Sequence, residues 1–243
     1  MAISGGPDIV EDSLVCHIDM ADKNCYTGSG STVQDLANST TTGTISGASF
    51  ANVNGGAISF DSSAETVQLN KKAENLGIGT ANNNFSIAVW FMDESNGSAF
   101  QTLFANESGY NARVGIYLQT NYRLFVRVRA GSGQATQYTS SENAYSPNTW
   151  NYGVLTFAKS PSRTIYAYLN GQYLGSGYNA TMEINGVFYY DVGNVAMKLG
   201  RSHHSYAYNP FTGKIACASI YNKVLTLDEV QQNYNATKGR FGL

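Results

Sequence analysis

The acidic residues are the first candidates for chemistry, because two carboxylates on one strand face can hydrolyse a glycosidic bond. In retaining enzymes of that kind the carboxyl groups lie about 5–5.5 Å apart, a spacing that a Glu-x-Asp-x-Glu run on a strand would supply. The sequence has no such run. Its adjacent acidic pairs are Glu11-Asp12, Asp93-Glu94 and Asp228-Glu229, and neighbouring strand residues point to opposite faces. We therefore expect no enzyme, and a glycoside hydrolase or polysaccharide lyase is the least favoured hypothesis.

The spacing of the histidines does not indicate a metal site. His203 and His204 are adjacent, with no cysteine or carboxylate at ligand spacing nearby. Adjacent histidines rarely both bind one ion, so a solvated loop is the favoured interpretation. His17 alternates outward on an expected strand, and we interpret it as a surface or interface residue.

The three cysteines, Cys16, Cys25 and Cys217, are an odd number. A disulfide framework in a secreted chain uses an even number. We therefore expect reduced thiols, as in a protein made in a reducing cytoplasm. A Cys16–Cys217 bridge remains an alternative if the first and last strands are neighbours.

Aromatic rings gather between residues 178 and 208, among basic and imidazole groups. Flat rings with hydrogen-bonding neighbours suit sugar rings and protein interfaces alike, and core or loop packing would explain them equally well. The candidate residues for binding a glycan or a partner are Tyr178, Tyr189, Tyr190, Arg201, His203, His204, Tyr206 and Tyr208.

Arg123, Arg127 and Arg129 alternate along the segment 122–129, which places them on one face of an expected strand. A solvated sheet face is the favoured interpretation. The sharper hypothesis is an assembly face that docks on an acidic neighbour.

Composition limits the partners of the chain. The formal net charge is −2, whereas binding to a phosphate backbone needs a basic surplus, so we expect no nucleic-acid partner. The apolar stretches have the length of strands, so we expect no membrane span. Residues 1–7 lack the basic and apolar regions of a signal peptide, and we expect none.

Apolar side chains recur with a period of two along the chain, which predicts that it is built mainly from strands. These strands would position the candidate residues. The run 85–92 is apolar on both faces, which is typical of a central strand. Asn170-Gly171 joins two alternating runs and predicts a type I′ hairpin. Such a pattern indicates two packed antiparallel sheets. The expected strands are 14–20, 57–61, 66–69, 85–92, 114–118, 122–129, 152–158, 164–169, 172–175, 195–199 and 214–221.

One helix is expected, over about 226–237. Thr226 and Glu229 form a capping box, and Gly239 would end the helix. We expect Leu227, Val230 and Tyr234 to dock on the sandwich. No linker or repeat divides the chain, so we predict an N-terminal arm over 1–13 and a single domain over 14–243.

Eight segments resemble laminin-G-like domains of the concanavalin A-like lectin-glucanase superfamily, in order and over nearly the whole chain. The resemblance implies an all-β, two-sheet antiparallel jelly-roll β-sandwich with one short C-terminal helix. The segments are Leu14–Asp19, Tyr26–Leu36, Gly56–Asp61, Phe85–Trp90, Asn148–Tyr152, Tyr168–Gln172, Leu199–Arg201 with Phe211–Ile215, and Ile220–Thr226.

The two ends, Gly6–Val10 and Gln232–Leu243, resemble a subgroup found in virion proteins of tailed phages, particularly marine ones. This resemblance implies a non-enzymatic virion structural protein: a capsid decoration, head-fibre or tail accessory subunit with glycan adhesion as an added role. It implies that the protein is made in the host cytoplasm and located in the virion. Its partners would be other virion proteins, a polysaccharide or cell-surface glycan, and further copies of itself. The alternative is a free carbohydrate-binding module or lectin.

The same resemblance raises the question of a structural calcium ion, because relatives of this fold sometimes bind one. Asp19 and Asp61 lie on early strands where such a site would fall. Calcium takes six to eight oxygen ligands, and relatives carry an acidic residue where this chain has Ala216-Cys217-Ala218. Solvated carboxylates are therefore favoured, and no other cofactor is expected.

Overall fold

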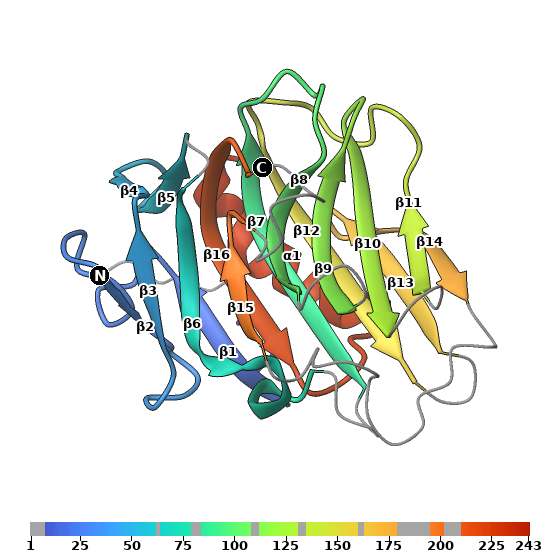
Figure 1. Cartoon of the computed structure of the whole chain (residues 1–243), viewed down its shortest axis with the longest axis horizontal. Coiled ribbons are helices and arrows are strands. Elements are labelled where there is room, and N and C mark those ends of the chain that lie inside the picture. Colours follow the sequence, from blue (N-terminus) through green and yellow to red (C-terminus); the bar gives the residue numbers. More distant parts are fainter. Residues whose placement is uncertain are drawn as a thin grey trace.

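The computed structural model describes residues 8–61, 64–78, 84–107, 112–130, 135–159, 163–178, 195–201 and 210–243. Two antiparallel sheets lie face to face, and one helix covers the outer side of the rear sheet (Figure 1). The predicted all-β sandwich with a C-terminal helix is therefore confirmed.

The rear sheet, here called sheet A, carries the helix on its outer face. Its first strand, Leu14–Asp19, pairs with its last strand, Gly213–Tyr221. In order across the sheet, the strands are β14 (Gln172–Tyr178), β13 (Thr164–Leu169), β12 (Trp150–Ala158), β7 (Phe85–Asp93), β16 (Gly213–Tyr221), β5 (Ala57–Phe60) and β4 (Ser49–Ala51), and β1 (Leu14–Asp19) also pairs with β16.

The front sheet, sheet B, is built from the other strands of the described residues. Its strands in order are β11 (Ala135–Thr139), β10 (Arg123–Ala130), β9 (Ala112–Gln119), β8 (Gln101–Glu107), β15 (Ala196–Leu199), β6 (Thr66–Lys72), β3 (Thr42–Ser46) and β2 (Thr32–Gln34). A 3-10 helix, η1 (Ala73–Leu76), follows β6.

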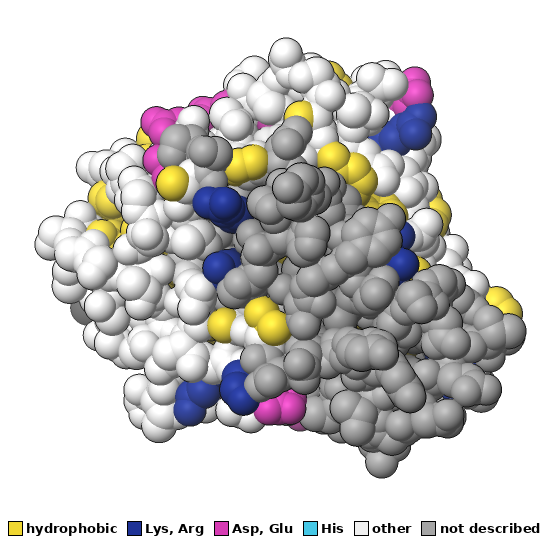
Figure 2. Space-filling view, viewed as in Figure 1, with side chains coloured by type: hydrophobic (Ala, Val, Ile, Leu, Met, Phe, Trp, Pro, Cys, Tyr) yellow, Lys and Arg dark blue, Asp and Glu magenta, His cyan; other side chains and the backbone are white. Residues whose placement is uncertain are grey.

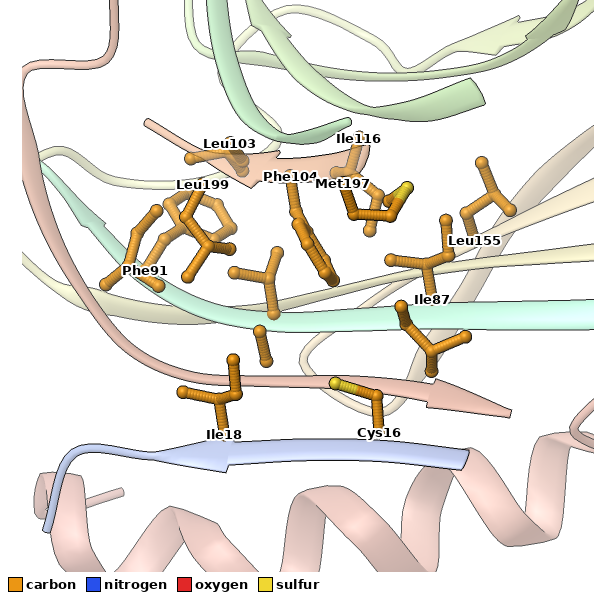
Figure 3. Packing of buried hydrophobic residues seen from close by; sticks show 14 of the residues in the cluster. Cys16, Ile18, Ile87, Phe91, Leu103, Phe104, Ile116, Leu155, Met197 and Leu199 are labelled. Carbon is orange, nitrogen blue, oxygen red and sulfur yellow. The ribbon is translucent and has the colours of Figure 1, made fainter. Parts of the chain in front are cut away.

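The main core lies between the sheets. Figure 3 shows Ile18 of β1 and Ile87 of β7 facing Phe104 of β8 and Leu199 of β15. The strand β7 lies between β12 and β16 and is buried on both faces, which confirms its predicted central position. Its outer face, including Trp90, belongs to a second cluster beneath the helix.

The helix α1 (Leu227–Lys238) begins with the predicted capping box of Thr226 and Glu229. Val230 is buried and Tyr234 packs on the sheet, but the prediction for Leu227 is wrong, because 41% of its surface is exposed. Asn233 is buried instead, and it accepts a hydrogen bond from the Val10 amide.

The end of the helix differs in detail from the prediction. The helix stops at Lys238 with Gly239 as its C-cap, but Gly239 keeps a right-handed helical conformation. The chain continues into a 3-10 turn, η3 (Gly239–Phe241), and the left-handed residue is Gly242. That short turn carries Phe241 onto Trp90, with 4.3 Å between the ring centroids.

Cys16, Cys25 and Cys217 are all free, as the odd count predicted. The alternative of a Cys16–Cys217 bridge is wrong even though β1 and β16 are neighbours. Cys16 belongs to the core between the sheets, whereas Cys217 belongs to the cluster beneath α1, so the two side chains lie on opposite faces of sheet A. No helix in the described ranges is long and apolar enough to cross a membrane.

Candidate functional site

Four tyrosines share the outer face of sheet A on β13 and β14, and we call them the tyrosine face: Tyr166, Tyr168, Tyr173 and Tyr178. Side chains alternate between the two faces of a strand. Ile165 and Ala167 point into the core, so Tyr166 and Tyr168 point outward. Across the hairpin, Tyr173 pairs with Tyr168, and Tyr178 pairs with Thr164.

Three of the four rings, those of Tyr166, Tyr168 and Tyr173, lie next to one another. The Tyr173 ring centroid lies 5.6 Å from that of Tyr168 and 6.5 Å from that of Tyr166. Tyr173 is 50% exposed and Tyr178 is 62% exposed, whereas Tyr168 is buried and supports them. Among the described residues, these two are the only exposed aromatic side chains.

The two strands that carry this face have no charged side chain. β13 reads Thr-Ile-Tyr-Ala-Tyr-Leu and β14 reads Gln-Tyr-Leu-Gly-Ser-Gly-Tyr, so neither strand has an ionisable group other than tyrosine. The polar neighbours are hydroxyls and an amide, from Thr164, Ser176 and Gln172. Burial raises the pKa of Tyr168, and a tyrosine hydroxyl is protonated and able to donate at neutral pH even without this shift.

Glycines hold the strand that displays these rings. On the inner face of β14, a Cβ added at Gly177 would lie 1.9 Å from the Gln137 carbonyl oxygen, and one added at Gly175 would meet the Tyr138 ring. Because Gly175 and Gly177 have no side chains, β11 can pack directly against β14. The Tyr138 hydroxyl of β11 donates a hydrogen bond to the Leu174 carbonyl of β14 at 2.7 Å. The edge strand is thus fixed from inside while its tyrosines face outward.

The predicted aromatic site is only partly within the described structure. Tyr178 belongs to the tyrosine face, and Arg201 is half-buried just after β15. The remaining candidates lie outside the described residues: Tyr189, Tyr190, His203, His204, Tyr206 and Tyr208.

The prediction missed Tyr166, Tyr168 and Tyr173, although the sequence held the signal. Tyr166 and Tyr168 alternate on a predicted strand, and the Asn170-Gly171 hairpin folds Tyr173 back against them. Both turn residues have the positive φ of a type I′ turn, 52° and 77°, so the predicted hairpin is confirmed.

The predicted arginine stripe lies on the outer face of sheet B. Arg123, Arg127 and Arg129 are half-buried on β10, with Phe125 between them. Arg123 pairs with Glu142, and the Arg127 guanidinium lies 5.5 Å from the Phe125 ring centroid. Arg127 and Arg129 line an open hollow of about 310 Å³. Figure 2 shows the described Lys and Arg side chains spread over this side of the molecule rather than gathered in one basic patch.

The two aspartates considered for calcium have separate partners. Asp19 Oδ1 accepts hydrogen bonds from Arg240 Nη1 at 2.5 Å and from the Ala21 amide. Asp61 lies against Glu65, and the hydrogen bond between their carboxyl groups raises the pKa of Asp61. Asp19 is instead close to His17 and Cys217, and the three ligand atoms lie within 4.8 Å of one another.

The acidic pairs in the sequence have structural roles. Asp93 is fully buried and accepts a hydrogen bond from the Tyr145 hydroxyl at 2.8 Å, while Glu94 pairs with Lys214. Asp12 and Glu229 both bind Lys223, each at 2.6 Å.

A sequence model of one protein family, Laminin_G_3, described as the concanavalin A-like lectin/glucanases superfamily, matches residues 61–231. A search of curated proteins finds no match.

Solved structures share the fold at low identity. Domain 4 of an extracellular arabinanase from Geobacillus stearothermophilus, in complex with arabinotriose, matches with a TM-score of 0.64 and 18% identity over 93% of this chain and all of that one. The receptor-binding domain of botulinum neurotoxin D matches with a TM-score of 0.68 and 13% identity, over 92% of this chain and 52% of that one.

The binding domain of Paraclostridial Mosquitocidal Protein 1 gives a TM-score of 0.69 and 17% identity over 93% of this chain. This chain spans about half the length of the two toxin domains, 52% in each case. At these identities the likeness shows a shared fold.

Proposed function

The chain belongs to the Laminin_G_3 family of the concanavalin A-like lectin/glucanases superfamily, and from this premise we propose that it is a non-enzymatic module that binds a neutral polysaccharide through the tyrosine face. The observation that carries the proposal is the pair of exposed rings, Tyr173 and Tyr178, on one uncharged strand.

The physical argument starts from the exposed rings. An aromatic side chain buries about 150–250 Å² when it is covered, and two of them at separate positions on one strand offer two apolar surfaces, each with a hydroxyl at its rim. Sugar rings present apolar C–H faces and hydroxyl edges, which match both features. The absence of charge on β13 and β14 favours a neutral chain over an acidic one.

The acidic residues support a non-enzymatic role. Catalysis by two carboxylates requires one of them to be placed as an acid and the other as a base or nucleophile. In the described structure Asp93 accepts a buried hydrogen bond, whereas Glu94, Asp12 and Glu229 form ion pairs with lysines. Asp61 and Glu65 touch each other, which is closer than the separation of about 5–5.5 Å in retaining glycosidases.

Two of the similar structures are consistent with the proposal. The arabinanase domain is in complex with arabinotriose, and the botulinum domain is a receptor-binding domain. These properties belong to those proteins. For this chain they support binding of a glycan as the role of the module.

A glycan array with the purified protein, run with calcium and again with EDTA, tests the proposal. Binding to neutral glycans that is unchanged by EDTA supports the tyrosine face. Binding that EDTA removes would mean that a metal ion is needed to bind the glycan. It would count against the tyrosine face and support the calcium ion considered at Asp19 and Asp61. Binding to acidic glycans alone would favour the hollow beside Arg127 and Arg129 and would contradict the proposal.

A second candidate function, a structural role on a tailed-phage particle, is favoured by one further observation. The two segments whose sequences resemble the phage subgroup lie together: the Val10 amide donates to Asn233 Oδ1 at 2.7 Å, and Gln232 Nε2 donates to the Asp8 carbonyl. In this proposal the module is located in the virion, binds other virion proteins or copies of itself, and adheres to glycans.

Mass spectrometry of purified particles tests this second role. Stoichiometric copies of the chain support it, and its absence from particles that form normally would contradict it. If the arginine stripe docks on an acidic neighbour, replacing Arg123, Arg127 and Arg129 by Ser lowers incorporation. Undiminished incorporation would contradict docking through the arginine stripe but would leave the proposed virion role open.

A further inference from the structure

We propose that His17, Asp19 and Cys217 form a binding site for a divalent transition-metal ion of the zinc type on the outer face of sheet A. Their imidazole nitrogen, carboxylate oxygen and sulfur lie within 4.8 Å of one another. Among the described residues, no other group of three His, Cys, Asp or Glu side chains comes so close. The site is independent of the tyrosine face.

The pairing of two strands assembles the cluster. β1 runs antiparallel to β16, with His17 opposite Ser219 and Asp19 opposite Cys217. His17 and Asp19 are two residues apart and therefore project from the same face of β1. β16 lies inside sheet A, between β7 and the strands β5 and β1, and its pairing with β1 fixes the spacing of the three side chains.

A β-bulge turns the cysteine toward the other two ligands. The register of β16 shifts between Ile215 and Cys217, and both Ala216 and Cys217 lie in the cluster on the outer face. Regular alternation from Ile215, which points into the core, would have turned Cys217 inward as well. Bulges often re-aim a side chain at a functional position, and here the thiol is placed beside an imidazole.

The spacing fits tetrahedral coordination after a small closure. With Zn–N and Zn–O of about 2.0 Å and Zn–S of about 2.3 Å, the ligand atoms of a tetrahedral site with one sulfur are about 3.3–3.5 Å apart. Cys217 Sγ already lies 3.9 Å from His17 Nδ1. The largest separation, at most 4.8 Å, must shorten by up to about 1.5 Å when the ion binds.

Room for a fourth ligand lies next to the cluster. His17, Cys217 and Ser219 line a hollow beneath α1 with Tyr221 and Asn233, and its volume is about 10 Å³. One water molecule needs roughly 10–15 Å³ and a few polar partners. Ser219 Oγ, 2.9 Å from His17 Nδ1, provides one of them.

The ligand atoms identify the class of ion. His17 offers an imidazole nitrogen and Cys217 offers a sulfur. Nitrogen and sulfur ligands favour zinc, whereas calcium takes oxygen ligands. Asp19 receives Arg240 and the Ala21 amide on Oδ1, so Oδ2 is the oxygen left to bind the ion.

Charged groups around the site act in both directions. Asp22 and Asp35 favour a cation near His17, and Arg240 opposes one. Zinc binds cysteine as the thiolate, so the ion takes the place of the proton on Cys217.

The test uses metal-free full-length protein titrated with Zn²⁺ against a chromophoric chelator, and with Co²⁺ as a spectroscopic probe. We expect one ion per chain and a thiolate-to-cobalt charge-transfer band. Cys217→Ser should remove that band and weaken zinc binding at least tenfold, and His17→Gln should weaken it similarly. Cys25→Ser is the matched control, because Cys25 is a buried free cysteine outside the cluster.

A second measurement needs no variant. One equivalent of zinc should slow alkylation of Cys217 in the native protein, mapped by peptide mass spectrometry, and leave Cys25 unchanged. The absence of stoichiometric binding, a cobalt spectrum without the thiolate band, or equal binding by Cys217→Ser would each overturn the proposal. None of these outcomes bears on binding of glycans by the tyrosine face.

Discussion

Arg240 Nη1 lies 2.5 Å from Asp19 Oδ1, so the last turn of the chain is joined to its first strand. The same guanidinium donates to the carbonyl groups of Asn54 and Gly56. The next residue, Phe241, packs on Trp90 and Trp150, with ring centroids 4.3 and 4.7 Å away. The C-terminal residues therefore close the outer layer of sheet A.

Arg240→Ala should lower the free energy of unfolding by about 2 kcal/mol. Hydrogen bonds to charged groups contribute about 1.5–3 kcal/mol each, but the Arg240 side chain is 19% exposed and solvent replaces part of the loss. Urea unfolding measures the change. Leu243→Ala is the control, since Leu243 is 50% exposed, and an unchanged midpoint for Arg240→Ala would contradict the role of the guanidinium.

Gly177→Ala should destabilise the protein by about 2 kcal/mol, in the range for overpacking a close contact. The added methyl would sit 1.9 Å from the Gln137 carbonyl oxygen and force β11 away from β14. Gly239→Ala provides the matched control, because its helical conformation accepts alanine and no atom lies within 4 Å. The control should be neutral or stabilised by about 0.4–1 kcal/mol; equal stabilities for the two variants would contradict the close packing.

Stability should fall as the pH rises above about 8.5. Burial raises the pKa of the thiols Cys16 and Cys217 and of the phenols Tyr145 and Tyr221, and it raises the pKa of Cys25 to about 12. The unfolded chain releases these protons at about pH 8.5 and 10, so above those values the unfolded state binds fewer protons than the folded one and gains stability.

Thermal unfolding between pH 8 and 11 measures this effect. Cys217→Ser and Cys25→Ser should each reduce the slope, because each removes a thiol that titrates only after unfolding. A melting temperature that stays level to pH 11 would contradict the burial of these groups.

Much of the fold could be predicted from the sequence because buried strands alternate regularly. The central strand β7, the Asn170-Gly171 hairpin and the capping box of α1 all follow local rules that the tertiary structure leaves intact. The hydrophobic pattern of a strand with one face in the core identified β10 in the same way.

Three of the strands that the prediction missed, β8, β2 and β4, break those rules or are too short to follow them. In β8 the register shifts between Thr102 and Phe104, so Leu103 and Phe104 both enter the core and the period of two is lost. The strands β2 and β4 have only three residues each, too few to show a period.

The candidate sites were harder to predict for a related reason. The bulge in β16 arises from the pairing of strands, which a single strand's sequence does not reveal. Regular alternation would have predicted Cys217 on the core face, away from His17. Leu227 followed the helical period but is exposed, while Asn233 is buried because the Val10 amide and the Tyr221 hydroxyl supply its partners.

The most direct test of the tyrosine face is affinity electrophoresis through gels that contain neutral polysaccharides, with the parent protein and a Tyr173→Ala/Tyr178→Ala variant. Leu36→Ala/Val53→Ala is the control, because it removes two apolar side chains that are each 36% exposed. We predict that at least one neutral polysaccharide retards the parent and the control equally, and that the tyrosine variant loses most of this retardation while keeping its melting temperature. Equal retardation of all three proteins, or no retardation of the parent by any neutral polysaccharide, would contradict the account.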